Sequence, residues 1–104
     1  MKASLRQQLE RLVLRLNELQ ATLNDPALSN DMQRFRAVNR EYAEVGGVVD
    51  LFRQYEARES DAAAAQALLE RDDDDPEMAG FAQEELAAAA ADLGRLHQTL
   101  QTAL

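Results

Sequence analysis

"LRQQLERLVLRLNELQATL", residues 5–23, places leucines at steps that alternate between four and three residues. The repeated leucines are Leu5, Leu9, Leu12, Leu16, Leu19 and Leu23. This is the a and d spacing of a heptad, which aligns the leucines along one side of an α-helix. Charged and polar side chains fill most of the positions between them. We therefore predict an amphipathic helix over about residues 3–24.

The next stretch, "NDPALSND" at residues 24–31, predicts a turn. Pro26 disfavours helical geometry at Asp25, and most of the following residues are turn and cap formers. Asn30 precedes Gln33 by three residues, which is the spacing of a capping-box-like helix start. A second helix is therefore expected from about residue 31.

The second segment continues to about Arg71 without a proline. Its apolar stripe keeps helical spacing across Gly46-Gly47, from Val45 to Val49. Each glycine costs a helix about 1 kcal/mol relative to alanine, so we predict a continuous or slightly bent helix. About forty residues at 1.5 Å each would span roughly 60 Å, which predicts an elongated molecule. The stripe comprises Met32, Phe35, Val38, Tyr42, Val45, Val49, Phe52 and Tyr55.

A third amphipathic segment follows Pro76 and reaches the last residue without a stop signal, which suggests that the chain was cut from a longer protein. The prediction is an all-α fold with a single helical domain over residues 1–104. We expect an elongated antiparallel three-helix bundle. Its long hairpin would pair residues 31–71 with 76–104, beside a shorter helix at 3–24. The alanine patches at 62–65 and 87–91 would face each other near the hairpin turn.

The acidic run "RDDDDPEMAGF", residues 71–81, has a structural and a metal-binding interpretation. Asp75 can cap a helix, Pro76 suits the first helical position, and Glu77 suits the positive end of the helix dipole. Asp72 to Asp74 would then form the connecting loop. A calcium loop instead spaces its ligands at alternate positions and needs a glycine and a distal glutamate. The run has neither, so we favour the structural interpretation and predict no metal site.

Other candidate chemistry is sparse. His97 is the only histidine, and Gly94 stands where a Glu-x-x-His metal motif needs its glutamate. We expect His97 to be solvated or half-buried, and we predict no catalytic residue and no cofactor. The nearest approach to a basic patch is formed by three arginines that do not share one helix face: Arg34, Arg36 and Arg40. They are the candidate partner contacts.

Composition and charge narrow the class of protein. The sequence has no cysteine and no apolar stretch long enough to cross a membrane, so the cytoplasm is the expected location. The net charge is −8. Residues 1–52 hold seven basic and seven acidic side chains, whereas residues 53–104 hold four basic and twelve acidic ones. Such a chain should repel free nucleic acid over half its surface and could bind a basic protein.

"FRAVNREYAEV", residues 35–45, resembles a segment of the bacterial peptide chain release factor 1 family. The similarity extends to "DPALSNDMQRF" before it and "VVDLF" after it, to "DDPEMAGFAQEEL" at 74–86, and to the start "MKASLRQQLERL". The chain departs from the family at Gly46-Gly47, in the long aspartate run and in the alanines at 87–91. The resemblance covers essentially all of the chain and implies the N-terminal helical domain of a longer factor.

This resemblance implies a role in translation termination at the stop codons UAA and UAG. The family's Gly-Gly-Gln release loop and Pro-x-Thr codon reader are both absent from this sequence, so the domain itself is not expected to be an enzyme. Its implied partners are the stalk base of the large ribosomal subunit and the GTPase release factor. The chain is expected to be mainly monomeric. An alternative hypothesis is a stand-alone acidic coiled-coil scaffold or oligomerisation module, which the leucine heptad supports equally well.

Overall fold

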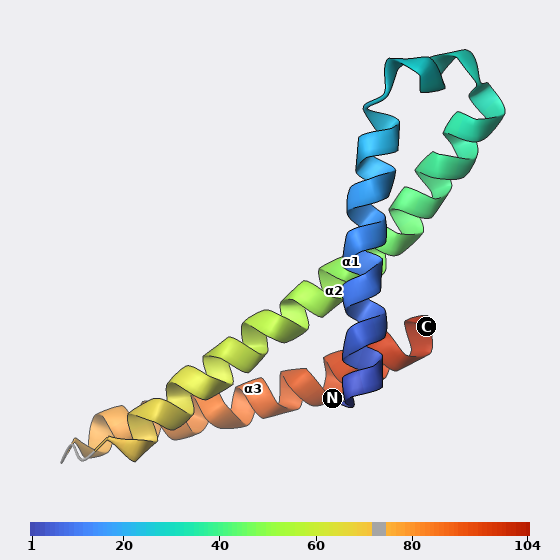
Figure 1. The fold of residues 1–104 in the computed structure, drawn as a ribbon. Helices are drawn as coiled ribbons and strands as arrows, with labels where there is room; N and C mark the ends of the chain where they lie inside the picture. Colours follow the sequence, from blue (N-terminus) through green and yellow to red (C-terminus); the bar gives the residue numbers. More distant parts are fainter. Residues whose placement is uncertain (72–74) are drawn as a thin grey trace. The chain divides into compact units, whose positions relative to one another are not determined.

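The computed structural model describes residues 1–71 and 75–104, and these residues form three α-helices and one short 3₁₀ helix (Figure 1). The elements are α1 (Ala3–Leu23), η1 (Pro26–Asn30), α2 (Met32–Glu70) and α3 (Pro76–Ala103). No β-strand occurs in the described part of the chain. The predicted all-α class and the three helices are confirmed, with ends within one residue of those expected. Within the two described ranges, no helix is both long and apolar enough to cross a bilayer.

Two compact units make up the chain, residues 1–51 and residues 52–104. The single elongated domain expected from the sequence stays a prediction. Helix α2 contributes its first twenty residues to unit 1 and the remainder to unit 2.

The core of unit 1 forms where the leucine stripe of α1 meets the first part of α2. Leu19, Val45 and Val49 are buried together. Five partly buried side chains pack against them: Leu12, Val13, Leu16, Val38 and Tyr42. Leu14, which lies off the stripe, is 63% exposed. Leucines of the heptad therefore contribute to a core within this chain, which is one of the two uses that their spacing allowed.

The connection from α1 to α2 is shaped by two aspartates. Asp25 is extended, as predicted, and its carboxylate accepts a hydrogen bond from the Ala27 N–H at 3.0 Å. Asp31 accepts one from the Arg34 N–H at 3.1 Å. The predicted capping role of Asn30 was therefore wrong by one residue. The reason is that Pro26 starts a 3₁₀ helix whose last residue is Asn30, so the residue preceding α2 is Asp31.

In unit 2, α3 runs back along the later part of α2 (Figure 1). Small side chains are prominent among its buried residues: Ala65, Ala82 and Ala89 are each no more than 3% exposed. Larger buried side chains in this unit are Phe52, Tyr55, Leu96 and Leu100. Alanines permit close approach of two helices but bury little apolar area.

Helix α3 begins as the acidic run predicted. Asp75 precedes the helix and accepts hydrogen bonds from the N–H groups of Glu77 and Met78, both at 3.2 Å. Pro76 occupies the first turn, where its missing N–H leaves nothing unsatisfied. The predicted loop at Asp72 to Asp74 lies outside the described residues.

Gly46 and Gly47 lie inside the continuous helix α2, as expected, and neither has a positive φ. A Cβ at Gly46 would meet Leu16 Cδ1 at 3.7 Å, an ordinary van der Waals distance. A Cβ at Gly47 would meet nothing within 4 Å. No close approach therefore requires a glycine at either position.

Replacing Gly47 by alanine should stabilise the chain. We expect Gly47→Ala to raise the free energy of unfolding by about 0.5–1 kcal/mol, because alanine loses less backbone entropy in a helix. Urea denaturation followed by circular dichroism measures it. The reverse change at a nearby exposed position, Ala43→Gly, should lower the stability by a similar amount. A destabilising Gly47→Ala would mean that α2 departs from helical geometry at the glycine pair.

Candidate functional surfaces

The three candidate arginines lie near the start of α2, and all are exposed. Arg36 and Arg40 are four residues apart and share one face of the helix. Arg34 lies about 200° around the helix axis from Arg36. The structure therefore does not bring the three together, as their spacing predicted. Among residues 1–71 and 75–104, no side chain forms an ion pair with any of these guanidinium groups.

A two-point ion pair joins α1 to α2 within unit 1. Arg15 Nε donates to Glu41 Oε2 at 2.6 Å, and Arg15 Nη2 donates to Glu41 Oε1 at 2.8 Å. Arg15 also donates to Glu18 at 3.1 Å. The hydrogen bond from Arg15 is the main cause that lowers the pKa of Glu41 below its ordinary 4.5. The same bond, followed by that to Glu18, raises the pKa of Arg15.

A second ionic cluster, centred on Arg58, joins α2 to α3 within unit 2. Arg58 Nη1 donates to Asp61 Oδ2 at 2.8 Å and to Glu85 Oε1 at 2.6 Å. Arg58 Nε lies 2.9 Å from Asp92 Oδ2, close enough for an ion pair but without hydrogen-bond alignment. The bonds to Asp61 and then Glu85 raise the pKa of Arg58. Asp92 also pairs with Arg95, whose Nη2 lies 3.7 Å from Asp92 Oδ1. Two cations thus face three carboxylates, which leaves the cluster negative by one charge.

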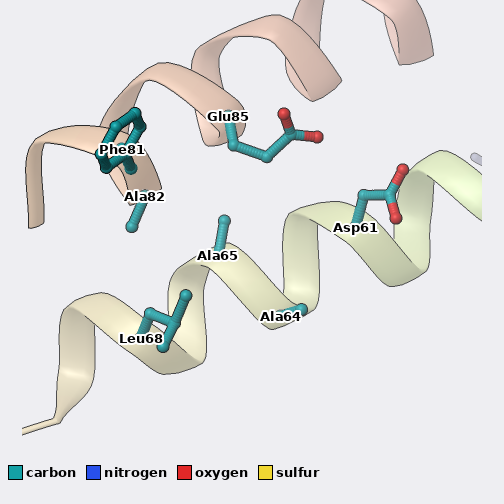
Figure 2. Close-up of a pocket in the computed structure, with 7 residues that line it drawn as sticks. All are labelled: Asp61, Ala64, Ala65, Leu68, Phe81, Ala82 and Glu85. Carbon is teal, nitrogen blue, oxygen red and sulfur yellow. The ribbon is translucent and has the colours of Figure 1, made fainter. Parts of the chain in front are cut away.

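An open groove lies beside this cluster, between α2 and α3 of unit 2 (Figure 2). Its volume is about 330 Å³. Helix α2 lines it with Asp61, Ala64, Ala65 and Leu68, and α3 lines it with Phe81, Ala82 and Glu85. Ala65 and Ala82 point toward each other in Figure 2. Ala82 lies outside the predicted patch at 87–91, so the predicted meeting of the two alanine patches stays a prediction. The Phe81 side chain is 64% exposed.

The Arg58 cluster and the groove were not predicted from the sequence. A partial signal was present, because Arg58 is one of only four basic residues among residues 53–104 and precedes Asp61 by three positions. That spacing indicates an ion pair within one helix. It does not indicate the bond to Glu85, which lies 27 residues further along the chain than Arg58.

His97 is half-buried, which agrees with one of the two environments expected for it. Its ring packs against Tyr55 with ring centroids 6.5 Å apart and an interplanar angle of 53°. Its Nε2 atom is buried and has no hydrogen-bond partner in the described part of the protein. Within that same part, no three histidine or acidic side chains come together in a group that could hold a metal ion. The histidine is accounted for by packing.

Comparison with known proteins identifies the family. A model of the PCRF domain matches residues 12–104. The chain belongs to the PCRF domain family. It is 50% identical over 100 residues to peptide chain release factor 1 of Leptothrix cholodnii, covering 96% of this chain and 27% of that protein. It is 47% identical over its whole length to peptide chain release factor 1 of Methylibium petroleiphilum, covering 28% of that protein.

These matches confirm the resemblance that residues 35–45 indicated. The chain spans little more than a quarter of the length of these curated relatives. No solved structure matches it. What the PCRF domain contributes here must therefore be inferred from its own surfaces.

The pair between Arg15 and Glu41 should make the stability of this PCRF domain depend on pH. A carboxylate whose pKa is lowered on folding stabilises the fold above its unfolded-state pKa, and this stabilisation is lost as the pH falls through the folded-state value. We expect Glu41→Gln to lower the Tm slightly at pH 7, because both side chains are more than one-third exposed and screened by water. The difference in Tm between the variant and the wild type should disappear as the pH falls below 4.5, the ordinary pKa of a glutamate.

Thermal melts between neutral and acidic pH measure this difference. The matched control is Glu44→Gln, an exposed glutamate of the same helix with no ion pair in the described structure. It should follow the wild type at every pH. A Glu41→Gln difference that widens on acidification would contradict the assigned role of the pair.

Proposed function

We propose that this chain is the N-terminal helical domain of a class I translation release factor, which as a whole protein directs termination at UAA and UAG. The observation that carries the proposal is the match along essentially the whole chain to the PCRF domain and to release factor 1 proteins. The proposed location is the cytoplasm, on the ribosome.

The proposed role of the domain is interaction rather than catalysis. The sequence contains neither Gly-Gly-Gln nor Pro-x-Thr, so codon reading and peptide release are assigned to the remainder of the whole factor. The domain would bind the ribosome at the stalk base of the large subunit and would also bind the GTPase release factor. An arm with this role needs stable helices with chemically distinct outer faces. The exposed Arg36 and Arg40 in unit 1 and the acidic surface of unit 2 supply such faces.

We place the ribosome-side contact on unit 1. Residues 1–52 carry no net charge, so this part of the chain is not repelled by rRNA as a whole. Arg36 and Arg40 are exposed, share a helix face and have no ion-pair partner among the described side chains. They can therefore bind an anionic partner without first breaking an internal salt bridge. Arg34 would contribute only to a partner that also reaches the other side of α2.

The alternative of a coiled-coil scaffold is less well supported by the contacts. A scaffold would use the leucine heptad as a seam between chains. In unit 1, Leu12, Leu16 and Leu19 of that heptad pack instead against Val45, Val49 and their neighbours on α2. The seam is therefore occupied within a single chain, which agrees with the proposed monomeric state.

A chimaeric factor tests the proposed function. The matching segment of the Leptothrix cholodnii factor would be replaced by this chain, and codon-dependent peptide release would be measured on purified ribosomes. We expect kcat/KM within about threefold of the parent factor at UAA and UAG, and no release at UGA. The parent factor lacking the segment is the control for the domain's contribution. A folded chimaera that fails to associate with termination ribosomes would overturn the proposal.

Charge reversal tests the ribosome-side contact. In the chimaera, the double change Arg36→Glu and Arg40→Glu should weaken ribosome binding on the order of tenfold, and more at low salt, because like charges then oppose the partner. Arg53→Glu, which reverses an exposed arginine of unit 2, is the matched control and should leave affinity nearly unchanged. Unchanged affinity in the double variant would remove this face from the interface.

A further inference from the structure

We infer that the groove around Phe81 binds a basic, amphipathic segment of a partner protein. An apolar side chain of the segment would enter the groove, and its lysines or arginines would lie against the surrounding carboxylates. The inference deepens the proposed function and rests on it in one respect, namely that the domain acts by binding other proteins. The contacts that define the groove stand without that assumption.

The first observation is an exposed aromatic side chain at a groove that is otherwise lined largely by apolar side chains. Phe81 is 64% exposed, although phenylalanine is among the residues that folding most often buries. Beside it, Leu68 and three alanines, Ala64, Ala65 and Ala82, line the groove. Because these small side chains stop short of the space between the helices, a volume of about 330 Å³ remains open. That is near the lower end of the range for pockets that bind small molecules, so it suits a single large apolar side chain.

A second hollow is also lined by Phe81. Its volume is about 230 Å³, and Pro76, Glu77, Gly80, Phe81 and Glu84 line it. A Cβ added at Gly80 would meet no atom within 4 Å, so the surface beside the ring is open. Phe81 thus lines both hollows, and a bound segment that covers the ring could contact both.

The charge around the ring defines the partner's chemistry. Asp61 and Glu85 lie at the groove, and Glu77 and Glu84 line the second hollow. Arg58 pairs with Asp61, Glu85 and Asp92, and Arg95 also pairs with Asp92, so two cations leave one of these three negative charges uncompensated. From Pro76 to Asp92 the sequence of α3 contains no basic residue. A cationic segment is therefore attracted to this surface, and an anionic one is repelled.

The same charges disfavour other occupants. A second copy of the chain would bring its own net charge of −8 to the interface. Nucleic acid and anionic bilayers would likewise be repelled, because residues 53–104 hold twelve acidic and four basic side chains. The occupant needs an apolar side to fit the groove and positive charge to match the carboxylates. A basic amphipathic protein segment has both properties.

Binding of a defined peptide to the intact 104-residue chain tests this inference. The probe is a synthetic helical peptide of about 15 residues, made of lysine and leucine with one tryptophan on its apolar face. The chain has no tryptophan, so the fluorescence reports on the peptide alone. We expect a Kd on the order of 10 µM at low salt. Amide chemical-shift changes should be centred on residues 61–68 and 77–85.

Matched variants distinguish peptide binding at the groove from non-specific hydrophobic binding elsewhere on the chain. Phe81→Ala should weaken binding by about tenfold or more, as for an aromatic anchor at an interface. Leu14→Ala removes an equally exposed apolar side chain from unit 1 and should have little effect, since Leu14 is 63% exposed. Ala64→Lys, which places a cation in the groove, should also abolish binding. Circular dichroism verifies that each variant is folded.

Three outcomes would overturn the inference. The first is equal binding of a peptide in which glutamate replaces every lysine. The second is equal loss from Leu14→Ala and Phe81→Ala. The third is an absence of peptide binding at low salt. In addition, the groove proposal would fail if the chain formed dimers through Phe81 in sedimentation experiments. The last result would assign the groove to a second copy.

The outcome for the groove can be distinguished from the outcome for the proposed function. If the peptide binds but the chimaeric factor does not reach termination ribosomes, the groove stands and the release-factor role fails. If the chimaera supports normal peptide release at stop codons but the isolated chain does not bind the synthetic peptide, the release-factor role stands and the groove proposal fails. A Phe81→Ala chimaera that loses activity only when the GTPase release factor is present would connect the two.

Discussion

A single apolar stripe along α2 supplies buried side chains to both units, and the packing of α1 and α3 depends on it. Val45 and Val49 belong to the core of unit 1, and Phe52, Tyr55 and Ala65 are buried in unit 2. The stripe works only if α2 keeps its helical repeat from Met32 to Glu70, since a change of phase would turn one set of side chains toward water. Gly46 and Gly47 stand at the weakest point of that repeat. Their helical conformation is therefore held by packing of the flanking valines rather than by intrinsic propensity.

The two units stabilise their helix pairs by different means. Unit 1 packs leucine, valine and tyrosine side chains against one another, which removes a large apolar area from water. Unit 2 has alanines at several of its buried positions, and these provide less area for each residue. Between α2 and α3, the Arg58 cluster adds directional contacts that alanine cannot make. The small side chains that allow the helices to approach also leave the groove beside Phe81 unfilled.

The sequence was sufficient to predict most of the helical framework because periodicity and helix-end chemistry are local properties. The leucine heptad and Pro76 defined the helices to within one residue, and the cap at Asp75 followed from the Asp-Pro pair. The cap of α2 was misplaced because Asn30 and Asp31 are both good cap residues, and only the extent of η1 decides between them. Separation of Arg34 from Arg36 and Arg40 was also predictable, since it depends on one helix alone.

The contacts between helices could not be read from the sequence in the same way. The Arg15 to Glu41 pair spans 26 residues, and the bond from Arg58 to Glu85 spans 27. Each depends on how far one helix is shifted along the other, which is set by the packing of several side chains at once. The groove beside Phe81 has the same origin, because its walls come from both α2 and α3. The contacts on which the proposed groove depends were thus ones that local spacing could not predict.

The division of charge between the units bears on how one small domain could serve two partners. A surface that binds two partners through the same chemistry makes them compete, whereas surfaces of opposite character can be selected independently. Unit 1 presents Arg36 and Arg40 without internal ion-pair partners in the described structure, and unit 2 surrounds an exposed Phe81 with carboxylates. Added salt should lower the affinity of both surfaces for their partners. A polyanion would compete only for the surface with Arg36 and Arg40, and a polycation only for the surface around Phe81. The two surfaces could therefore select different partners by charge alone, without any conformational change in the chain.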